Sequence, residues 1–285
     1  MVTDYCLLSK MTAIKLSSQS SRQFWEIPVL FEDDSLLAID KPSGLATSPD
    51  NPDSEEPNLL ALLHSAIRDA RPWARDRGIT FLTNVHRLDP EVSGALLLSK
   101  SKEVSSTLAN TFGSAQVIHR YLALVQGAPD QEQMDITHKL APHPARPGRV
   151  HVDPKHGKRS HTRVAIQERF DGWSLLQCDA LTNRPHQIRV HLRYVGLPLV
   201  GDSFYGGRPL LLSRLKSDYR LKPNQKERPL LGRPALHSES LTFAHPLSGS
   251  SITIFASLPK DLSVALKYLH RYSPGLSTNH PTIDD

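Results

Sequence analysis

Apolar and polar residues recur along this chain with two different periods, which distinguish helices from strands. Apolar residues at helical spacing predict four amphipathic helices, at residues 58–71, 101–112, 187–195 and 260–271. Short apolar or alternating runs predict a pair of strands around an acidic turn and four further strands, at residues 29–44, 93–99, 120–127, 163–170 and 173–182. Strands outnumber helices and do not alternate regularly with them. We therefore expect an α+β fold with a largely antiparallel sheet.

The segment HRLDPEVSG at residues 86–94 places one carboxylate, Asp89, beside Arg87 and between apolar runs. Its proline and glycine favour tight turns, and a predicted strand follows at 93–99, so the loop can hold the carboxylate in a fixed direction. The alternative is a turn aspartate that only bonds its own loop, which is the more common role of an isolated Leu-Asp-Pro. The other motifs favour a reactive carboxylate.

A second segment, NRPHQIRVHLRYVG at residues 183–196, is dense in groups that bind anions or pair with a carboxylate. Its apolar residues have helical spacing, which predicts a short helix at 187–195, ended by the glycine that follows. Arg189 and Arg193 share another face of this helix. An arginine aimed at Asp89 would keep that aspartate ionised and oriented.

With these residues the chain resembles the RluA family of RNA pseudouridine synthases. The resemblance rests on segments that occur in the family order: IDKPSG at 39–44, HRLDPEVSG at 86–94, HRYLALVQG at 119–127, NRPHQIRVHL at 183–192, LHSESLTFAHPLSG at 236–249 and FASLP at 255–259. The resemblance as a whole covers roughly residues 27 to 270. The resemblance implies a long, mainly antiparallel sheet that is bisected by a catalytic cleft and flanked by helices and loops.

The resemblance also implies roles for single residues. Asp89 matches the catalytic aspartate, Arg87 the arginine that takes the place of the flipped nucleotide, and Tyr121 the tyrosine that packs against the target base. Arg189 matches the basic residue that pairs with the aspartate, and Leu192 matches an apolar residue that lines the pocket. We expect RNA contact from further residues of these motifs, namely His86, Lys41, His186, Gln187 and Arg193.

The implied reaction suits these residue types. It breaks an N-glycosidic bond, turns the uracil over and rejoins it to the sugar through carbon, with no net redox change, so no cofactor is expected. It needs a carboxylate that acts as a nucleophile or stabiliser in a pocket that excludes water. Asp89 supplies that carboxylate, and Tyr121 can stack on a flipped base. Two departures from the family pattern, Val92 for threonine and Asn183 for glycine, remove no group that the reaction requires.

The charge distribution favours RNA as the partner. Residues 139–163 carry seven Lys or Arg and one acid, and residues 207–233 carry eight and two, so the two segments together hold +12. The chain as a whole has a net charge of +5, which leaves −7 for the remainder. Basic segments in an otherwise acidic chain suit a phosphate backbone. Solubility-promoting loops are the alternative reading.

Length and composition predict a globular enzyme with three parts. With 285 residues, 39% of them hydrophobic, the chain can bury a sizeable core. We expect a flexible arm at 1–26, too short for the small RNA-binding domain of some relatives, a catalytic domain at 27–271, and a tail at 272–285. Two cysteines give no disulfide framework, and no apolar run approaches the ~20 residues of a membrane span, so we expect a cytoplasmic protein. We expect a monomer, although the sequence leaves the oligomeric state open.

Other functions fit the sequence less well. A non-catalytic RNA-binding protein on the same fold would not need Asp89, Tyr121 and Arg189 together. A hydrolase would want a second carboxylate, and the candidates are Asp40 and Asp202, of which Asp202 reads as a structural turn residue. The histidines lack metal-ligand spacing and companion ligands, so no metal is expected. The substrate, ribosomal or transfer RNA, stays open. We also expect Arg189→Ala to reduce turnover more than stability.

Overall fold

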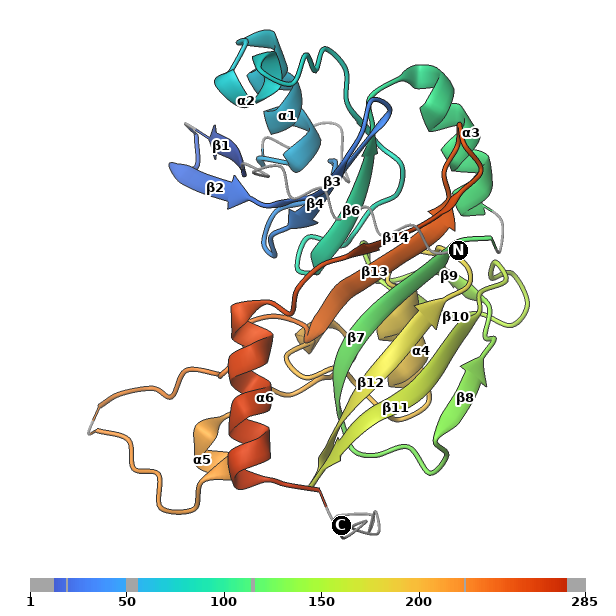
Figure 1. Ribbon diagram of the computed structural model, residues 1–285. Helices are drawn as coiled ribbons and strands as arrows, with labels where there is room; N and C mark the ends of the chain where they lie inside the picture. Colours follow the sequence, from blue (N-terminus) through green and yellow to red (C-terminus); the bar gives the residue numbers. More distant parts are fainter. Residues whose placement is uncertain (1–12, 19, 50–55, 114–115, 223, 276–285) are drawn as a thin grey trace, which may run out of the picture. The chain divides into compact units, whose positions relative to one another are not determined.

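A computed structural model of the protein describes residues 13–18, 20–49, 56–113, 116–222 and 224–275 (Figure 1). The chain forms two compact units, each assembled from two segments. Unit 1 takes its described residues from 1–117 and 240–256, and unit 2 takes them from 118–239 and 257–285. The long strand β13 (Leu236–Ala244) contributes residues to both units.

Unit 1 combines short strands with three helices. Its strands are β1 (Ile14–Ser18), β2 (Gln23–Ile27), β3 (Val29–Glu32), β4 (Leu36–Lys41), β5 (Thr83–Asn84), β6 (Ser93–Ser99), residues 240–244 of β13, and β14 (Ser251–Phe255). Its helices are α1 (Leu59–Arg68), α2 (Pro72–Arg75) and α3 (Lys102–Gly113). The sheet order is β3-β4-β6-β13, with β5 on β6 and β14 on β13, while β1 and β2 form a separate antiparallel hairpin.

The core of unit 1 explains why its strands read as apolar runs. Every residue of β6 is buried, so this strand has no polar face and cannot alternate. Its Leu97 packs in one cluster with Leu108 of α3 and Phe243 of β13. Helix α1 starts at Asn58, whose side chain accepts a hydrogen bond from the backbone N–H of Ala61 at 2.9 Å.

Unit 2 holds the longest strands and the other helices. Its strands are residues 236–239 of β13, β7 (Ile118–Gln126), β8 (Gln133–Ile136), β9 (Leu140–Pro142), β10 (Val150–Val152), β11 (Thr162–Phe170) and β12 (Trp173–Ala180). Its helices are α4 (Gln187–Tyr194), a 3-10 turn at Ser203–Tyr205, α5 (Leu212–Leu215) and α6 (Lys260–Tyr272). Within this unit the sheet order is β13-β7-β12-β11-β8, and β9 and β10 form a separate hairpin.

Alternation along β7 directs its side chains to two layers. Leu122 and Leu124 pack with Leu262 and Leu266 of α6, so this helix covers one face of the unit 2 sheet. Figure 1 shows α6 on this face and α4 on the opposite face of β7, β12 and β11. Residues at odd positions of β7, Tyr121 among them, therefore project toward the α4 side.

The predicted helices and the predicted strand pairs are confirmed. The predicted helix at 187–195 is α4, and the strand predicted at 93–99 coincides with β6. The expectation of a flexible arm at 1–26 is wrong for residues 14–18 and 23–26, because β1 and β2 pair through five registered residue pairs and bury Ile14 and Ile27 completely. Residues 1–12 lie outside the described residues. None of the described helices has the length and apolar character needed to cross a bilayer.

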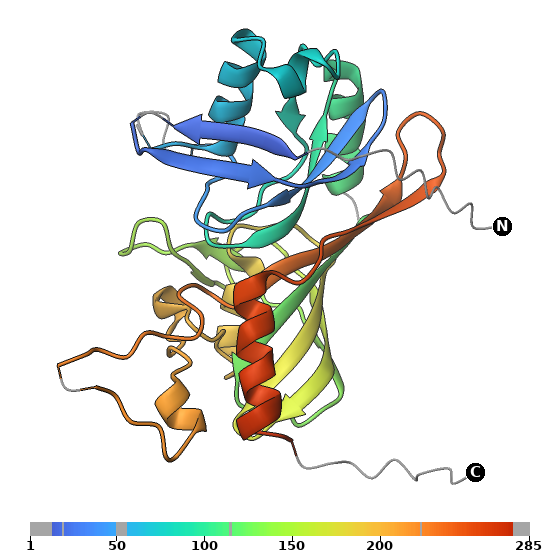
Figure 2. The ribbon, with the colours of Figure 1, turned by 60° about the vertical axis from the view of Figure 1, so that its left-hand side comes forward.

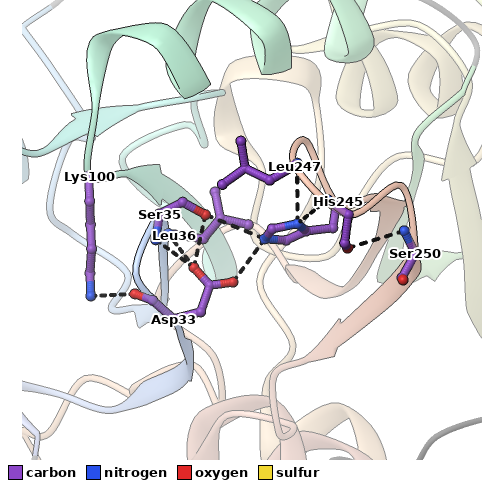
Figure 3. Close-up of polar contacts among 8 residues, drawn as sticks. Asp33, Ser35, Leu36, Lys100, His245, Leu247 and Ser250 are labelled. Carbon is purple, nitrogen blue, oxygen red and sulfur yellow. Dashed lines mark hydrogen bonds and ion pairs between the residues drawn. The ribbon is translucent and has the colours of Figure 1, made fainter.

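Two turns of unit 1 are joined by a carboxylate–imidazole contact (Figure 3). Asp33 Oδ1 accepts hydrogen bonds from the backbone N–H groups of Ser35 and Leu36, both at 2.7 Å. Its Oδ2 lies 3.0 Å from His245 Nε2, in the turn between β13 and β14. His245 Nδ1 accepts from the backbone N–H of Leu247 at 3.3 Å, so Nε2 carries the proton that is donated to Asp33.

We expect Asp33→Ala to lower the free energy of unfolding by about 1–3 kcal/mol, because it leaves the donors of two turns without their acceptor. The neighbour Asp34 is exposed and has no such contact with any described residue, so Asp34→Ala should change stability by less than about 0.5 kcal/mol. Urea denaturation of both variants measures the difference. Equal effects of the two substitutions would show that the Asp33–His245 contact does not stabilise the unit.

Candidate functional site

The predicted catalytic aspartate lies in unit 1, in a tight turn that leads into β6. The backbone N–H of Val92 donates to the carbonyl of Asp89 at 3.0 Å, which closes the turn. The side chain of Asp89 is partly exposed and that of Arg87 is exposed, whereas Leu88 between them is buried. The loop therefore presents its two charged residues and is anchored by the apolar residue.

A buried threonine fixes the backbone of this loop. Thr47, which is 2% exposed, accepts a hydrogen bond from the N–H of Leu88 at 3.1 Å and donates one to its carbonyl at 2.9 Å. Both backbone groups of the residue before Asp89 are thus satisfied by one hydroxyl. The sequence reasoning did not identify Thr47, although it lies three residues after the IDKPSG motif.

Lys41 also supports the loop. Its side chain is 0% exposed, and its ammonium donates to the carbonyls of Pro42 at 2.9 Å, Leu45 at 2.7 Å and Pro90 at 3.1 Å. These bonds satisfy all three N–H donors of an ammonium. Lys41 therefore joins the IDKPSG loop to the turn that follows Asp89. Its predicted contact with RNA gains no support from this burial and stays a prediction.

His86 is likewise enclosed by the unit. Its Nε2 accepts a hydrogen bond from the backbone N–H of Leu97 at 3.1 Å, and its ring stacks on Phe112 with centroids 5.2 Å apart. Burial lowers the pKa of His86 to about 3, so the imidazole is neutral at physiological pH. Its predicted RNA contact also stays a prediction that the burial does not favour.

Tyr121 lies on β7 in unit 2, and its ring is largely buried. Its hydroxyl is 3.1 Å from His119 Nδ1, and His119 Nε2 is 2.9 Å from the hydroxyl of Ser238. The rings of Tyr121 and His119 stack with centroids 4.2 Å apart. This chain of bonds fixes the direction of the Tyr121 ring on the face of the sheet that bears α4.

Arg189 forms a buried ion pair with Asp202. Nε lies 2.8 Å from Oδ2 and Nη2 lies 2.9 Å from Oδ1, and the side chains are 3% and 1% exposed. This two-point geometry is the strong form of an arginine–carboxylate contact. Asp202 is therefore a structural turn residue, as its sequence context predicts. The predicted pairing of Arg189 with Asp89 joins the two units and stays a prediction.

The turn that carries Asp202 depends on glycine. A Cβ atom on Gly201 would lie 2.3 Å from the carbonyl oxygen of Arg233, and one on Gly207 would lie 1.8 Å from that of Leu199. Neither position has room for a side chain. The glycines of the segment VGDSFYGG thus allow the close backbone approach that places Asp202 against α4.

The side chain of Tyr205 connects His186, the residue directly before α4, to the β9–β10 hairpin. Its hydroxyl lies 2.6 Å from His186 Nδ1 and accepts the backbone N–H of Val150 at 3.0 Å. His186 adopts a left-handed conformation, with φ 52°, directly before α4. Arg149 of the hairpin lies 4.6 Å above the ring of the exposed Phe204. Tyr205, Phe204 and Arg149 were not singled out by the sequence reasoning.

The other predicted residues of α4 divide between its two sides. Gln187 is buried, and it bonds Thr182 at 2.7 Å and the carbonyl of His161 at 3.0 Å. Leu192 is fully buried and Arg193 is exposed. Gln187 therefore anchors the helix, and Arg193 remains available to an anionic ligand.

The structure brings the predicted residues together in two groups. Unit 1 holds Asp89 and Arg87 with His86 and Lys41, and unit 2 holds Tyr121 with the residues of α4. The catalytic cleft that the sequence predicts would use residues of both groups and stays an expectation. Within the described ranges, no group of three or more histidine, cysteine or acidic residues is arranged to hold a metal ion.

Burial also affects a carboxyl group of β4. The pKa of Asp40 is raised from 3.8 to about 6 by burial, although the neighbouring ammonium of Lys41 acts to lower it. Asp40 was one of two candidates for the second carboxylate of a hydrolase. The other, Asp202, is bound to Arg189.

Comparison with known proteins identifies relatives over most of the chain. The family model described as RNA pseudouridylate synthase matches residues 35–194. Ribosomal large subunit pseudouridine synthase D of Nitrosomonas europaea is 34% identical over 275 residues, which are 95% of this chain and 74% of that protein. Ribosomal large subunit pseudouridine synthase C of Haemophilus influenzae is 34% identical over 245 residues, 86% of this chain and 69% of that protein.

Solved structures share the fold. Human RNA Pseudouridylate Synthase Domain Containing 4 aligns with a TM-score of 0.63 at 18% identity, and covers 85% of this chain and 92% of that one. Human RNA Pseudouridylate Synthase Domain Containing 1 aligns with a TM-score of 0.61 at 21% identity, over 90% and 91%. The predicted α+β fold with a mainly antiparallel sheet is thereby confirmed.

We expect Asp202→Asn to lower the free energy of unfolding by about 3–5 kcal/mol, because it leaves the buried guanidinium of Arg189 without its counter-charge. Asp76 is the matched control, since its pair with Arg75 has side chains 62% and 67% exposed. Asp76→Asn should cost less than about 1 kcal/mol in the same denaturation experiment. Losses of unfolding free energy of similar size in the two variants would contradict the assignment of Asp202 as the buried counter-charge of Arg189. The burial of this pair also changes the expectation for Arg189→Ala, which should now harm stability as well as turnover.

The raised pKa of Asp40 predicts a pH-dependent stability. The folded state binds this proton more tightly than the unfolded state, so the free energy of unfolding should fall as pH rises from about 4 to about 6. Asp40→Asn removes this dependence and should be more stable than the natural protein at pH 7 but not at pH 4. Denaturation at several pH values tests this, with Asp34→Asn as a control for the change in net charge. A pH-independent difference would contradict it.

Proposed function

This chain belongs to the RNA pseudouridylate synthase family, and we propose that it isomerises uridine in large-subunit ribosomal RNA with Asp89 as the catalytic carboxylate. The observation that carries the proposal is the Asp89 loop, which lies inside the region matched by the family model and is fixed by Thr47 and Lys41. The choice of RNA rests on the names of the relatives, which are ribosomal large subunit pseudouridine synthases.

The fixed loop suits a reaction in which a carboxylate meets the sugar or the base at one defined point. A catalytic group held in the productive geometry can contribute several kcal/mol to lowering the barrier. The backbone bonds on Leu88 and Pro90, on either side of Asp89, restrict the carboxylate without binding it. Arg87, exposed on the same loop, would occupy the space that the flipped nucleotide leaves in the RNA.

Tyr121 would form the wall against which the flipped uracil packs. Its hydroxyl is engaged by His119, so the ring offers an aromatic surface in a fixed direction. Stacking on an aromatic ring contributes about 1–3 kcal/mol per base. Leu192, buried in α4, would supply apolar surface to the same pocket.

Arg189 would pair with Asp89 and orient its carboxylate. Its Nε and Nη2 are bound by Asp202, which sets the plane of the guanidinium. Its Nη1 would donate a hydrogen bond to the carboxylate of Asp89. Because the plane is set by a buried partner, the arginine would lose little conformational freedom when it orients the aspartate.

RNA contact would come from exposed and partly exposed groups around these residues. His186, with Nδ1 facing the hydroxyl of Tyr205, would direct Nε2 toward the RNA, and Arg193 would face a phosphate. Lys41, His86 and Gln187 would act indirectly, by holding loops and helix in place. We further propose that the protein acts in the cytoplasm as a monomer and needs neither a metal ion nor a cofactor, since the reaction has no redox step.

We expect Asp89→Asn to reduce turnover by roughly 10³-fold or more while RNA binding stays within about threefold, because the amide keeps the shape of the carboxylate but not its charge. Pseudouridine mapping in total RNA of cells that lack the protein, complemented with natural or variant protein, identifies the site. Loss of one site in large-subunit ribosomal RNA, restored only by the natural protein, is the expected result.

Retained activity of Asp89→Asn would refute the catalytic assignment. A lost site in transfer RNA would replace the proposed substrate and leave the reaction intact. Binding of RNA without formation of pseudouridine, by purified natural protein on transcripts, would favour the non-catalytic alternative.

A further inference from the structure

Unit 2 carries a loop that none of the matched motifs includes. We call the described residues 211–222 and 224–229 the basic arm. Figure 2 shows it extending away from the sheet of unit 2 beside α6, with the short helix α5 at its start. The family model ends at residue 194, before the arm begins.

The base of the arm is firmly anchored. Leu210 and Leu231, on either side of it, are each 1% exposed and pack in the core beneath α6. The N–H of Leu230 donates to the carbonyl of Leu210 at 2.8 Å, which closes the base. Glu227 accepts the backbone N–H of Ser213 at 2.8 Å and its hydroxyl at 2.5 Å. The arm is therefore a projecting loop with a fixed base and not a flexible linker.

The charge on the arm is one-sided. It has six Lys or Arg and two acids, and both acids are engaged within it, because Glu227 binds Ser213 and Asp218 lies 3.6 Å from Lys216. The other five cations are all exposed, and among the described residues none of them is paired with a carboxylate: Arg214, Arg220, Lys222, Lys226 and Arg228.

From this arrangement we infer that the basic arm is a docking surface for the phosphate backbone of a structured RNA, outside the catalytic motifs. This inference rests on the proposed function. Unpaired cations on a projecting loop would repel one another without a polyanion, and each phosphate that they neutralise releases a condensed counterion. The anchored base would let these contacts hold the RNA in a constant position. Because these contacts reach phosphates and not base edges, they would raise the affinity for any RNA stem of suitable shape and fix its position.

The test is the salt dependence of binding. In the variant Arg220→Glu/Lys222→Glu/Lys226→Glu, the plot of log affinity against log salt should lose about 0.7–0.9 in slope for every phosphate contact removed, or roughly 2 in all. The dissociation constant for a natural-length ribosomal RNA domain should rise about 10- to 100-fold at physiological salt. Turnover at saturating RNA should stay unchanged, because the arm contributes no reacting group.

A matched control reverses three other exposed cations, in Lys102→Glu/Lys260→Glu/Lys267→Glu. It changes the net charge by the same amount, and it should leave the salt slope within about 0.5 of the natural value. Thermal unfolding of both variants should match that of the natural protein, since the substituted side chains are exposed.

The possible results distinguish a failure of the proposed docking surface from a failure of the proposed enzymatic activity. An unchanged slope in the arm variant, or an equal loss in the control, would overturn the docking surface. Natural protein that neither forms pseudouridine nor binds the RNA would overturn the proposed function instead. Retained activity on a short stem–loop, together with weakened binding of the longer domain, is the result that supports the arm.

Discussion

The buried ion pair of Arg189 and Asp202 is the interaction on which the candidate site of unit 2 depends. Two charges removed from water carry a desolvation cost that only close, two-point bonding offsets. The bonds of 2.8 and 2.9 Å meet this requirement. They require the turn of Asp202 to lie against α4. The same turn has no room for a Cβ atom at Gly201 or Gly207, because these glycines lie against the carbonyls of Arg233 and Leu199. The same turn then places Tyr205 beside His186 and the β9–β10 hairpin.

Unit 1 uses a buried cation in a similar way. Lys41 gives its three N–H donors to carbonyls of the two loops that the sequence identifies as motifs. An apolar side chain in that position would remove this donor from the carbonyls of Pro42 and Leu45, whereas the carbonyl of Pro90 would keep the N–H of Gly44 at 2.8 Å. Thr47 likewise satisfies the backbone N–H and carbonyl of Leu88, the residue before Asp89. In both units a buried basic side chain holds loops of the unit together.

The sequence predicted elements well where periodicity was strong and one face was buried. Helix α6 and strand β6 follow directly from their apolar patterns. The β1–β2 hairpin was missed because β1, with the sequence IKLSS, and its polar flanks look like a disordered end. Its burial comes from contacts with α1 that no local pattern shows. The catalytic motif was found from residue types, but its support by Thr47 depends on a contact 41 residues away.

Motif membership and exposure therefore give different information about the same residue. Lys41, His86 and Gln187 belong to the motifs and are buried, whereas the cations of the basic arm belong to no motif and are exposed. A reaction that occurs at one uridine needs a rigid pocket, and rigidity comes from buried polar groups whose hydrogen bonds are satisfied. Recognition of a large polyanion needs charges that water and counterions can reach. One chain can provide a rigid pocket and a reachable charged surface only by using different residues for each. Some of its basic side chains are therefore buried and hold loops in place, and others lie on an exposed surface.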